Sequence, residues 1–170
     1  MLKMRPRLNA GKVLVARLYD ETVRRSRNPE LYGRMGAPDT VEGRFELLTA
    51  HMLLLIERLN ASGERGAAIG QMLFDLFVRN LDGALREMGV ADLAVGKRMK
   101  GLGRLIYGRA VSYREAFAAA NPDDLAALVG RTILAGRPDA APAPLAGYLV
   151  VEKARLAAIG DDQLLEGGGE

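Results

Sequence analysis

Hydrophobic residues recur along most of the chain at the three- and four-residue spacing that places them on one face of a helix. The clearest example follows intervals of four, four, four and three, at Leu73, Phe77, Leu81, Leu85 and Met88. A half-buried strand would instead alternate apolar and polar residues, and no convincing stretch of the chain does so. The pattern therefore predicts an all-α protein.

Capping residues and helix breakers divide this pattern into segments. A first amphipathic helix is expected from about residue 12 to the break at Asn28-Pro29, followed by a short helix that Gly33 and Gly36 end. The clearest start signal is Asn121-Pro122, a capping amide before a proline, with two acids behind it in the first turn. The longer helices are expected at about 41–60, 67–88, 92–120, 122–136 and 145–159.

The length of 170 residues suits one domain. With so many short connections between helices, we expect a single compact, bundle-like domain of about six or seven helices over residues 8–160. Residues 1–7 are expected to form a basic N-terminal tail. Residues 161–170, which end in a run of glycines between acids, are expected to form a flexible acidic tail.

Composition excludes several classes of chemistry. There is no Cys, so no disulfide framework, thiolate nucleophile or cysteine zinc site is possible, and one His cannot build a multi-histidine metal centre. Glu87 lies beside other carboxylates, but nothing near it in sequence supplies a nucleophile or metal ligand. We therefore expect no catalysis at these carboxylates, and no cofactor and no metal.

The formal net charge is +3, and it is unevenly distributed along the chain. Residues 1–30 are basic and residues 121–170 are acidic. The basic end suits contact with phosphate, acidic lipid or an acidic partner, although a solvated arginine-rich segment is the simpler interpretation. No uninterrupted apolar stretch is long enough to span a membrane, and no secretory signal is evident, so a cytoplasmic location is expected, with peripheral contact at the membrane a further prediction.

Charged residues follow two of the predicted helices. On the first, alternating charges occur at i, i+4, i+7 and i+11, namely at Asp75, Arg79, Asp82 and Arg86. They form either a polar ridge that binds a partner or a solvated ladder of weak ion pairs. His51, on a very apolar helix, is either a proton-linked or ligand contact or, as we favour, a packed and hydrogen-bonded histidine.

The second charged helix combines basic residues with unusual glycines. Lys97, Lys100 and Arg104 share one face, which suits RNA or acidic lipid, but few aromatic residues lie among them and a solvated face is the simpler interpretation. Each glycine inside a helix costs about 1 kcal/mol relative to alanine. We expect close packing of another backbone, rather than a break, to explain the four glycines at 96, 101, 103 and 108.

Two segments resemble a known family. The first, residues 31–48, reads LYGRMGAPDTVEGRFELL and continues to His51. The second begins with LFDLF at 73–77, continues through LREMGVADLAVGKRMK at 85–100 and ends with YGR at 107–109. Both are similar to the ubiquinol–cytochrome c chaperone family, assembly factors of respiratory complex III.

The resemblance implies a helical, non-enzymatic assembly factor that binds newly made cytochrome b before or during its insertion, with the ribosome and a small partner protein as further partners in mitochondrial members. Helix-in-groove docking of an apolar client segment, framed by the two charged helices, is the expected mode. The resemblance and the two charged helices together give these client- or partner-binding candidates: Asp39, Arg44, His51, Asp75, Asp82, Arg86, Glu87, Lys97, Lys100, Arg104, Tyr107 and Arg109.

Two other functions stay open at this point. One is an RNA- or ribosome-binding helical module that depends on Lys97, Lys100 and Arg104. The other is a homodimeric interaction domain that uses the glycine-lined helix around Gly101 and Gly103.

Overall fold

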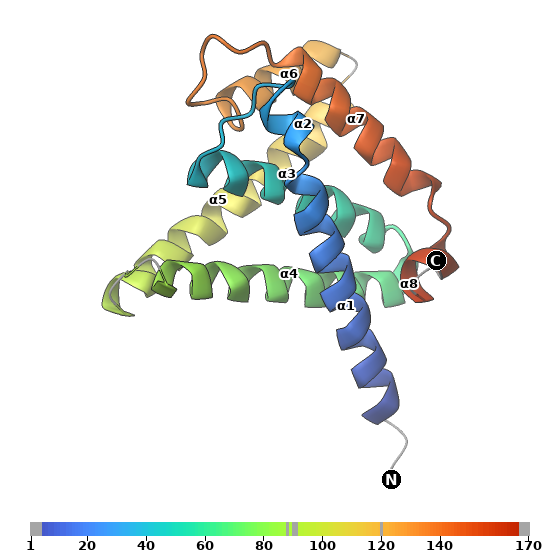
Figure 1. The fold of residues 1–170 in the computed structure, drawn as a ribbon. Coiled ribbons are helices and arrows are strands. Elements are labelled where there is room, and N and C mark those ends of the chain that lie inside the picture. Colours follow the sequence, from blue (N-terminus) through green and yellow to red (C-terminus); the bar gives the residue numbers. More distant parts are fainter. Residues whose placement is uncertain (1–4, 88, 90–91, 120, 167–170) are drawn as a thin grey trace. The chain divides into compact units, whose positions relative to one another are not determined.

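The structure, a computed structural model, describes residues 5–87, 89, 92–119 and 121–166. These residues form helices and loops and contain no strand, so the predicted all-α class is confirmed. Figure 1 shows the helices in chain order. They are α1 (Arg5–Ser26), α2 (Pro29–Tyr32), α3 (Val41–Asn60), α4 (Gly63–Glu87), α5 (Asp92–Ala118), α6 (Pro122–Arg131), α7 (Ala143–Ala158) and α8 (Asp161–Glu166).

Side chains that cap helices fix several of these boundaries. The Asn121 carboxamide oxygen accepts a hydrogen bond from the Asp123 amide at 3.0 Å, so α6 starts where the sequence predicted. Asn28 caps α2 in the same way, through the Glu30 amide at 3.1 Å. The Thr40 hydroxyl accepts from the Gly43 amide at 3.1 Å and caps α3.

Other boundaries differ from the prediction, because a local apolar pattern does not fix where a helix begins or ends. Helix α1 already begins at Arg5, and α4 begins at Gly63 rather than near residue 67. Helix α6 ends at Arg131, and the chain then turns so that Ile133 and Leu134 are buried. Residues 161–166 were expected in a flexible tail, but they form α8, because burying Leu164 and Leu165 holds this segment to the fold.

The chain divides into two compact units. Unit 1 comprises Met1–Glu21, Leu55–Leu105 and Ile159–Glu170, and unit 2 comprises Thr22–Leu54 and Ile106–Ala158. Each unit is therefore assembled from segments that are distant in sequence.

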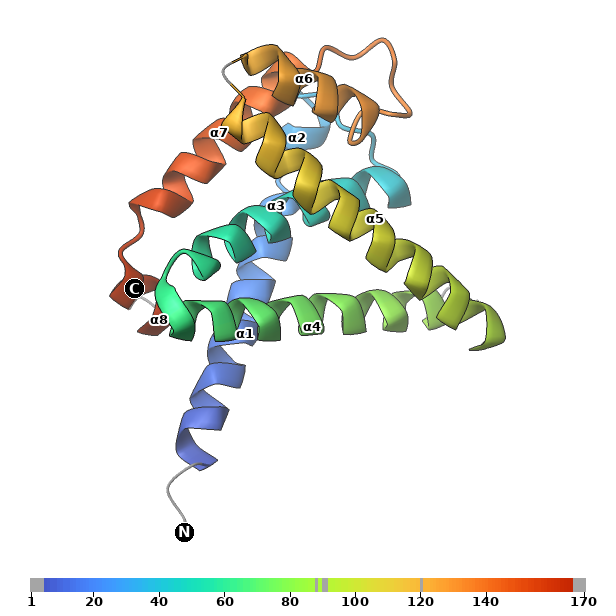
Figure 2. The same ribbon diagram turned by 180° about the vertical axis from the view of Figure 1, so that it is seen from behind.

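In unit 1, the end of α3, the first half of α4 and α8 share a core that includes Leu59, Leu73 and Phe77. Figures 1 and 2 show α8 beside the start of α4, where the Arg65 guanidinium donates to the Leu165 carbonyl at 3.1 Å. The Arg58 guanidinium ties α3 to the same end of the chain, through the Asp161 carboxylate at 2.7 Å. These contacts give α8 a defined position within unit 1.

In unit 2, α6 and α7 pack against each other, as Figure 2 shows. The core includes fully buried leucines from four elements, among them Leu31, Leu47, Leu128 and Leu149. Polar side chains are buried here as well, including His51 and Glu152. Unit 2 therefore contains the buried polar network analysed below.

The glycines of α5 do not have the close neighbours that we expected. A Cβ added at any of Gly96, Gly101, Gly103 or Gly108 would meet nothing within 4 Å among the described residues, and α5 is continuous through all four. Neither close packing nor a helix break therefore explains them.

Gly43 is different, because a Cβ there would lie 2.1 Å from the Pro38 carbonyl oxygen. The loop before α3 folds back onto the first turn of that helix, and only glycine leaves room for it.

We expect Gly43→Ala to lower the free energy of unfolding by about 1–3 kcal/mol, because the loop backbone must move to admit the methyl group. The matched control is Gly108→Ala, which adds the same methyl group at an open helical position. It should raise stability by about 1 kcal/mol through helix propensity. Denaturant unfolding of the two variants measures both changes, and equal effects would contradict the assignment of Gly43.

Candidate functional site

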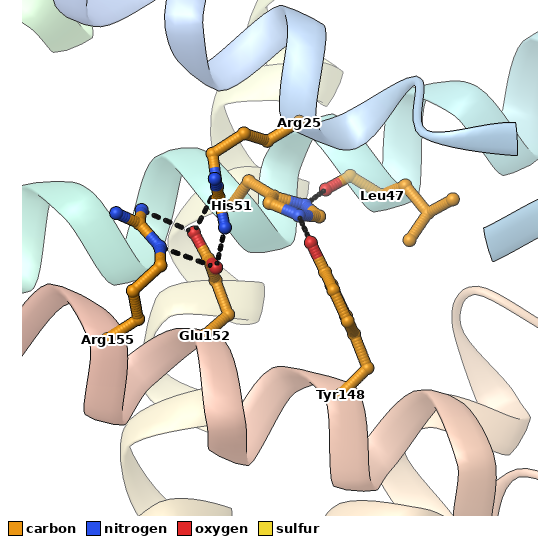
Figure 3. A network of polar contacts seen from close by, with 6 residues as sticks. All are labelled: Arg25, Leu47, His51, Tyr148, Glu152 and Arg155. Atoms are coloured by element: carbon orange, nitrogen blue, oxygen red, sulfur yellow. Dashed lines mark hydrogen bonds and ion pairs between the residues drawn. The ribbon is translucent and has the colours of Figure 1, made fainter. Parts of the chain in front are cut away.

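The predicted site residues fall into two groups, buried and exposed, and His51 belongs to the first. Its side chain is 2% exposed in the core of unit 2. Nδ1 lies 2.7 Å from the Leu47 carbonyl oxygen and Nε2 lies 2.8 Å from the Tyr148 hydroxyl. Figure 3 shows both contacts; the first lies within α3, and the second joins α3 to α7. His51 is therefore not available to a partner, which corrects its place among the candidates and matches the interpretation favoured above.

These contacts assign the tautomer of His51. A carbonyl oxygen only accepts hydrogen bonds, so Nδ1 must carry the proton and donate to Leu47. Nε2 is then the acceptor, and the Tyr148 hydroxyl donates to it. Burial lowers the pKa of His51, although the bond to Leu47 acts in the opposite direction. The ring is held neutral as a link between two helices.

Glu152 on α7 forms the centre of the same network (Figure 3). The Arg25 guanidinium donates to its two carboxylate oxygens at 2.9 and 2.7 Å, and Arg155 does the same at 2.9 and 2.7 Å. Burial alone would raise the pKa of Glu152, but hydrogen bonds from Arg155 and Arg25 outweigh it and lower this pKa to about 2. The carboxylate, only 4% exposed, stays charged and ties the end of α1 to α7.

A second bidentate pair accounts for Arg109. Its guanidinium donates to both oxygens of the Glu46 carboxylate, at 2.9 and 2.6 Å, and joins α5 to α3 within unit 2. The hydrogen bond to Glu46 raises the pKa of Arg109. Arg109 is 23% exposed and Glu46 is 12% exposed, so the pair is largely shielded from solvent. This geometry points to a role in holding the fold.

Asp39 and Arg44 pair with each other at 2.6 Å on the surface of unit 2, where both are more than half exposed. The hydrogen bond from Arg44 lowers the pKa of Asp39. An exposed pair of this kind contributes little to stability. With the Thr40 cap and the close approach of Pro38 to Gly43, this pair places the centre of the first motif at the start of α3.

The exposed group lies mainly in unit 1. On α4, Asp82 and Arg86 form one rung of the predicted ladder at 2.9 Å. Asp75 instead accepts from the Gln71 carboxamide at 2.9 Å, and Glu87 is exposed at the end of the helix. On α5, the basic side chains at 97, 100 and 104 are exposed. Whether these two faces frame a groove stays a prediction.

Tyr107 also lies on α5, but it belongs to unit 2. It is 74% exposed, and so it is accessible as the sequence analysis required. Apart from the surface pair at Asp39 and Arg44, eight of the twelve candidates reach solvent. Asp82 is half-exposed, and the other seven are exposed, namely Asp75, Arg86, Glu87, Lys97, Lys100, Arg104 and Tyr107.

Sequence reasoning did not identify the feature that distinguishes this part of unit 1. We call residues 78–105, the second half of α4 and the first part of α5, the arm. Of its described residues, Val95 alone is buried. Figures 1 and 2 show that the end of α4 and the start of α5 lie near each other and that the two helices then diverge. Large apolar side chains in the arm are therefore only half-buried, namely Val78, Leu81, Leu85, Met99, Leu102 and Leu105.

Sequence reasoning also missed the partners in the buried network. No local sequence pattern marks these partners, because their contacts join residues 63 to 127 positions apart. They are Arg25, Glu46, Tyr148 and Glu152. Among the described residues there is no cluster of potential metal ligands, and no helix is long and apolar enough to cross a membrane.

Because His51 is the only histidine, its titration can be followed without interference. We expect its pKa in the folded protein to lie below the usual 6.5. A lowered histidine pKa means that the unfolded chain binds the proton more readily, so the free energy of unfolding should fall as pH falls below about 6.5. NMR of the imidazole protons in folded and urea-unfolded protein measures both values. A folded value at or above the unfolded one would contradict the buried neutral ring.

Glu152→Gln tests the buried carboxylate. Its folded pKa of about 2 lies below the usual 4.5, so the carboxylate stabilises the fold fully above about 4.5 and loses this effect as pH falls towards 2. The advantage of wild type over the variant should be at most about 3 kcal/mol near neutral pH and should vanish over that range. Thermal unfolding as a function of pH measures it. Glu115→Gln, at an exposed carboxylate, is the control and should change little.

Comparison with known proteins identifies the family of this chain. The ubiquinol–cytochrome c chaperone family matches residues 33–170. The crystal structure of the Cbp3 homolog from Brucella abortus is similar at 34% identity and a TM-score of 0.85, covering 96% of this chain and 91% of that one. No curated protein shows significant similarity. The match spans both motifs and nearly the whole fold, and the chain therefore belongs to the ubiquinol–cytochrome c chaperone family.

Proposed function

We propose that this protein is a non-enzymatic assembly factor that binds newly made cytochrome b and shields it before or during insertion. Family membership supports the chaperone class. The observation that carries the proposal within the structure is the arm, whose described residues include six half-buried apolar side chains and one buried residue, Val95.

The arm has the physical properties that a chaperone surface requires. Burying apolar area stabilises by about 25 cal/mol per Å², so half-buried Leu and Met side chains keep part of that free energy for a partner. Helix segments with few buried contacts also open at low cost, which allows them to adjust to a client. A client helix destined for a membrane is apolar and needs such a surface until it inserts.

The charged side chains of the arm suit the same role. Arg86 and the basic residues of α5 are exposed and Asp82 is half-exposed, on the same two helices as the half-buried apolar side chains. A polar surround keeps an apolar surface soluble while it is unoccupied and discourages association with itself. Because both signs are present, the loops that flank a client helix can be recognised by their charge as well.

The groups that would suit acid–base chemistry are engaged elsewhere. His51 is buried and hydrogen-bonded on both ring nitrogens, and Glu152 is held by two guanidinium groups. Neither is placed to meet a substrate, which supports binding rather than catalysis. Binding to the ribosome and to a small partner protein stays a prediction from the resemblance.

Site-specific photo-crosslinking in cells tests the client. A photoreactive amino acid replaces Leu85 or Leu102 in the arm, and the captured protein is identified by mass spectrometry. We expect cytochrome b to be captured from both positions, because both side chains are half-buried and available to a partner. The matched controls are Val150 and Val151 on α7 of unit 2, which are 52% and 66% exposed but lie outside the arm.

Capture of cytochrome b from the control positions alone would place the client surface in unit 2 and contradict the role of the arm. Deleting the gene gives an independent readout. The amount of assembled complex III should fall while its transcripts persist, and unchanged complex III would reject the assembly function altogether.

A further inference from the structure

We propose that the outer face of α5 in unit 1 docks the protein on the surface of an anionic lipid bilayer. We call this face the basic face and define it by Lys97, Lys100 and Arg104. All three side chains are exposed, and no ion pair among the described residues involves them. The proposal adds a partner to the function above and does not depend on the identity of the client.

The sequence around the basic face carries charge of one sign. Residues 93–114 contain no Asp or Glu, and Arg98 is exposed beside the three defining residues. Arg109, farther along α5, is already neutralised by Glu46, so it adds nothing to this face. The basic face therefore keeps its charge available for an anionic partner.

Helix geometry aligns the three residues. Positions 97, 100 and 104 follow the spacing i, i+3 and i+7, which places them on one side of α5. The buried Val95 and the half-buried Met99 and Leu102 follow the spacing i, i+4 and i+7 and lie on the opposite side. The basic face is therefore turned away from the apolar side of α5 and is free to meet a surface.

The glycines of α5 acquire a role in this arrangement. Gly101 and Gly103 lie between Lys100 and Arg104, Gly96 directly precedes Lys97, and a Cβ at each glycine would meet nothing within 4 Å. Side chains absent at these positions let the helix backbone come close to a flat surface while the long Lys and Arg side chains reach phosphate groups beside it. This account replaces the close packing within the chain that we expected from the sequence.

The observations favour lipid over RNA. Recognition of single-stranded RNA relies on aromatic side chains that stack on bases. None of residues 93–105 is aromatic, and the exposed Tyr107 on the next turn of α5 is a single ring, whereas such recognition stacks several bases. Attraction to a bilayer requires only clustered basic charge next to a flat anionic surface, and each Lys or Arg near it strengthens binding about fivefold. The basic face has the clustered charge that a bilayer requires and lacks the set of aromatic side chains that RNA recognition requires.

Vesicle co-sedimentation tests the proposal with the full chain. Wild type should bind vesicles made of equal parts phosphatidylglycerol and phosphatidylcholine at about 0.15 M salt, and it should not bind pure phosphatidylcholine. The triple variant Lys97→Gln, Lys100→Gln, Arg104→Gln should bind on the order of a hundredfold more weakly. The matched control removes the same charge at exposed positions elsewhere, through Arg79→Gln, Arg114→Gln and Arg131→Gln. It should lose far less affinity for the vesicles.

Three results would overturn the proposal. In the first, wild type does not bind the anionic vesicles. In the second, both triple variants weaken vesicle binding equally. In the third, wild type binds polyuridine RNA more tightly than vesicles, and the variant at 97, 100 and 104 loses RNA binding to the same extent. The last result would assign the basic face to nucleic acid. None of them bears on capture of cytochrome b from Leu85 or Leu102, so failure here is distinguishable from failure of the assembly function.

A second measurement avoids changing the basic residues. The chain has no native Cys, so Gly103→Cys carries an environment-sensitive dye on α5, and Gly136→Cys carries it at an equally open position in unit 2. Anionic vesicles should shift the emission of the dye at 103 and leave that at 136 unchanged. Binding without a shift at 103 would contradict docking through the basic face.

Discussion

The buried carboxylate of Glu152 is the interaction on which the structure of unit 2 depends most. Two guanidinium groups, from Arg25 and Arg155, take up both of its oxygens. A carboxylate at this depth is stable only with such partners, since an unpaired buried charge costs several kcal/mol. The end of α1 must therefore lie against α7, and the neutral His51 ring, bonded to Tyr148, holds α3 against the same helix. The centre of the first family motif, with the Thr40 cap and the close approach at Gly43, sets where α3 starts.

Unit 1 is built on a different principle. Its core lies at the start of α4 and at α8 and includes Leu73, Phe77 and Leu165. Of the described residues in the arm, only Val95 is buried. Beyond the core, the arm leaves apolar side chains half-buried and charged side chains exposed. A well-packed core resists change, whereas a segment with few buried contacts adjusts easily. A protein that must bind and later release an apolar client needs both properties, and here they belong to different segments.

Residues that look alike in the sequence take different roles because of what lies opposite them. Lys100 and Arg109 are basic residues of one helix, and both match the family motif. Arg109 meets the Glu46 carboxylate and is fixed, whereas Lys100 meets no carboxylate among the described residues and stays exposed. Similarity to the family therefore does not by itself separate residues that hold the fold from residues that contact a partner.

The sequence by itself determined the helical class and several helix starts. Apolar spacing and capping residues act over three or four positions, so the Asn121 cap and the stripe of α4 could be recognised without the fold. The family could be recognised as well, since its motifs are continuous runs of residues. The tertiary structure alone decided that His51 is buried, that Arg109 is paired and that the glycines of α5 are open. The partners of His51 and Arg109 lie 97 and 63 positions away, and no local pattern encodes which distant side chain the folded chain brings near a residue, or whether it brings one at all.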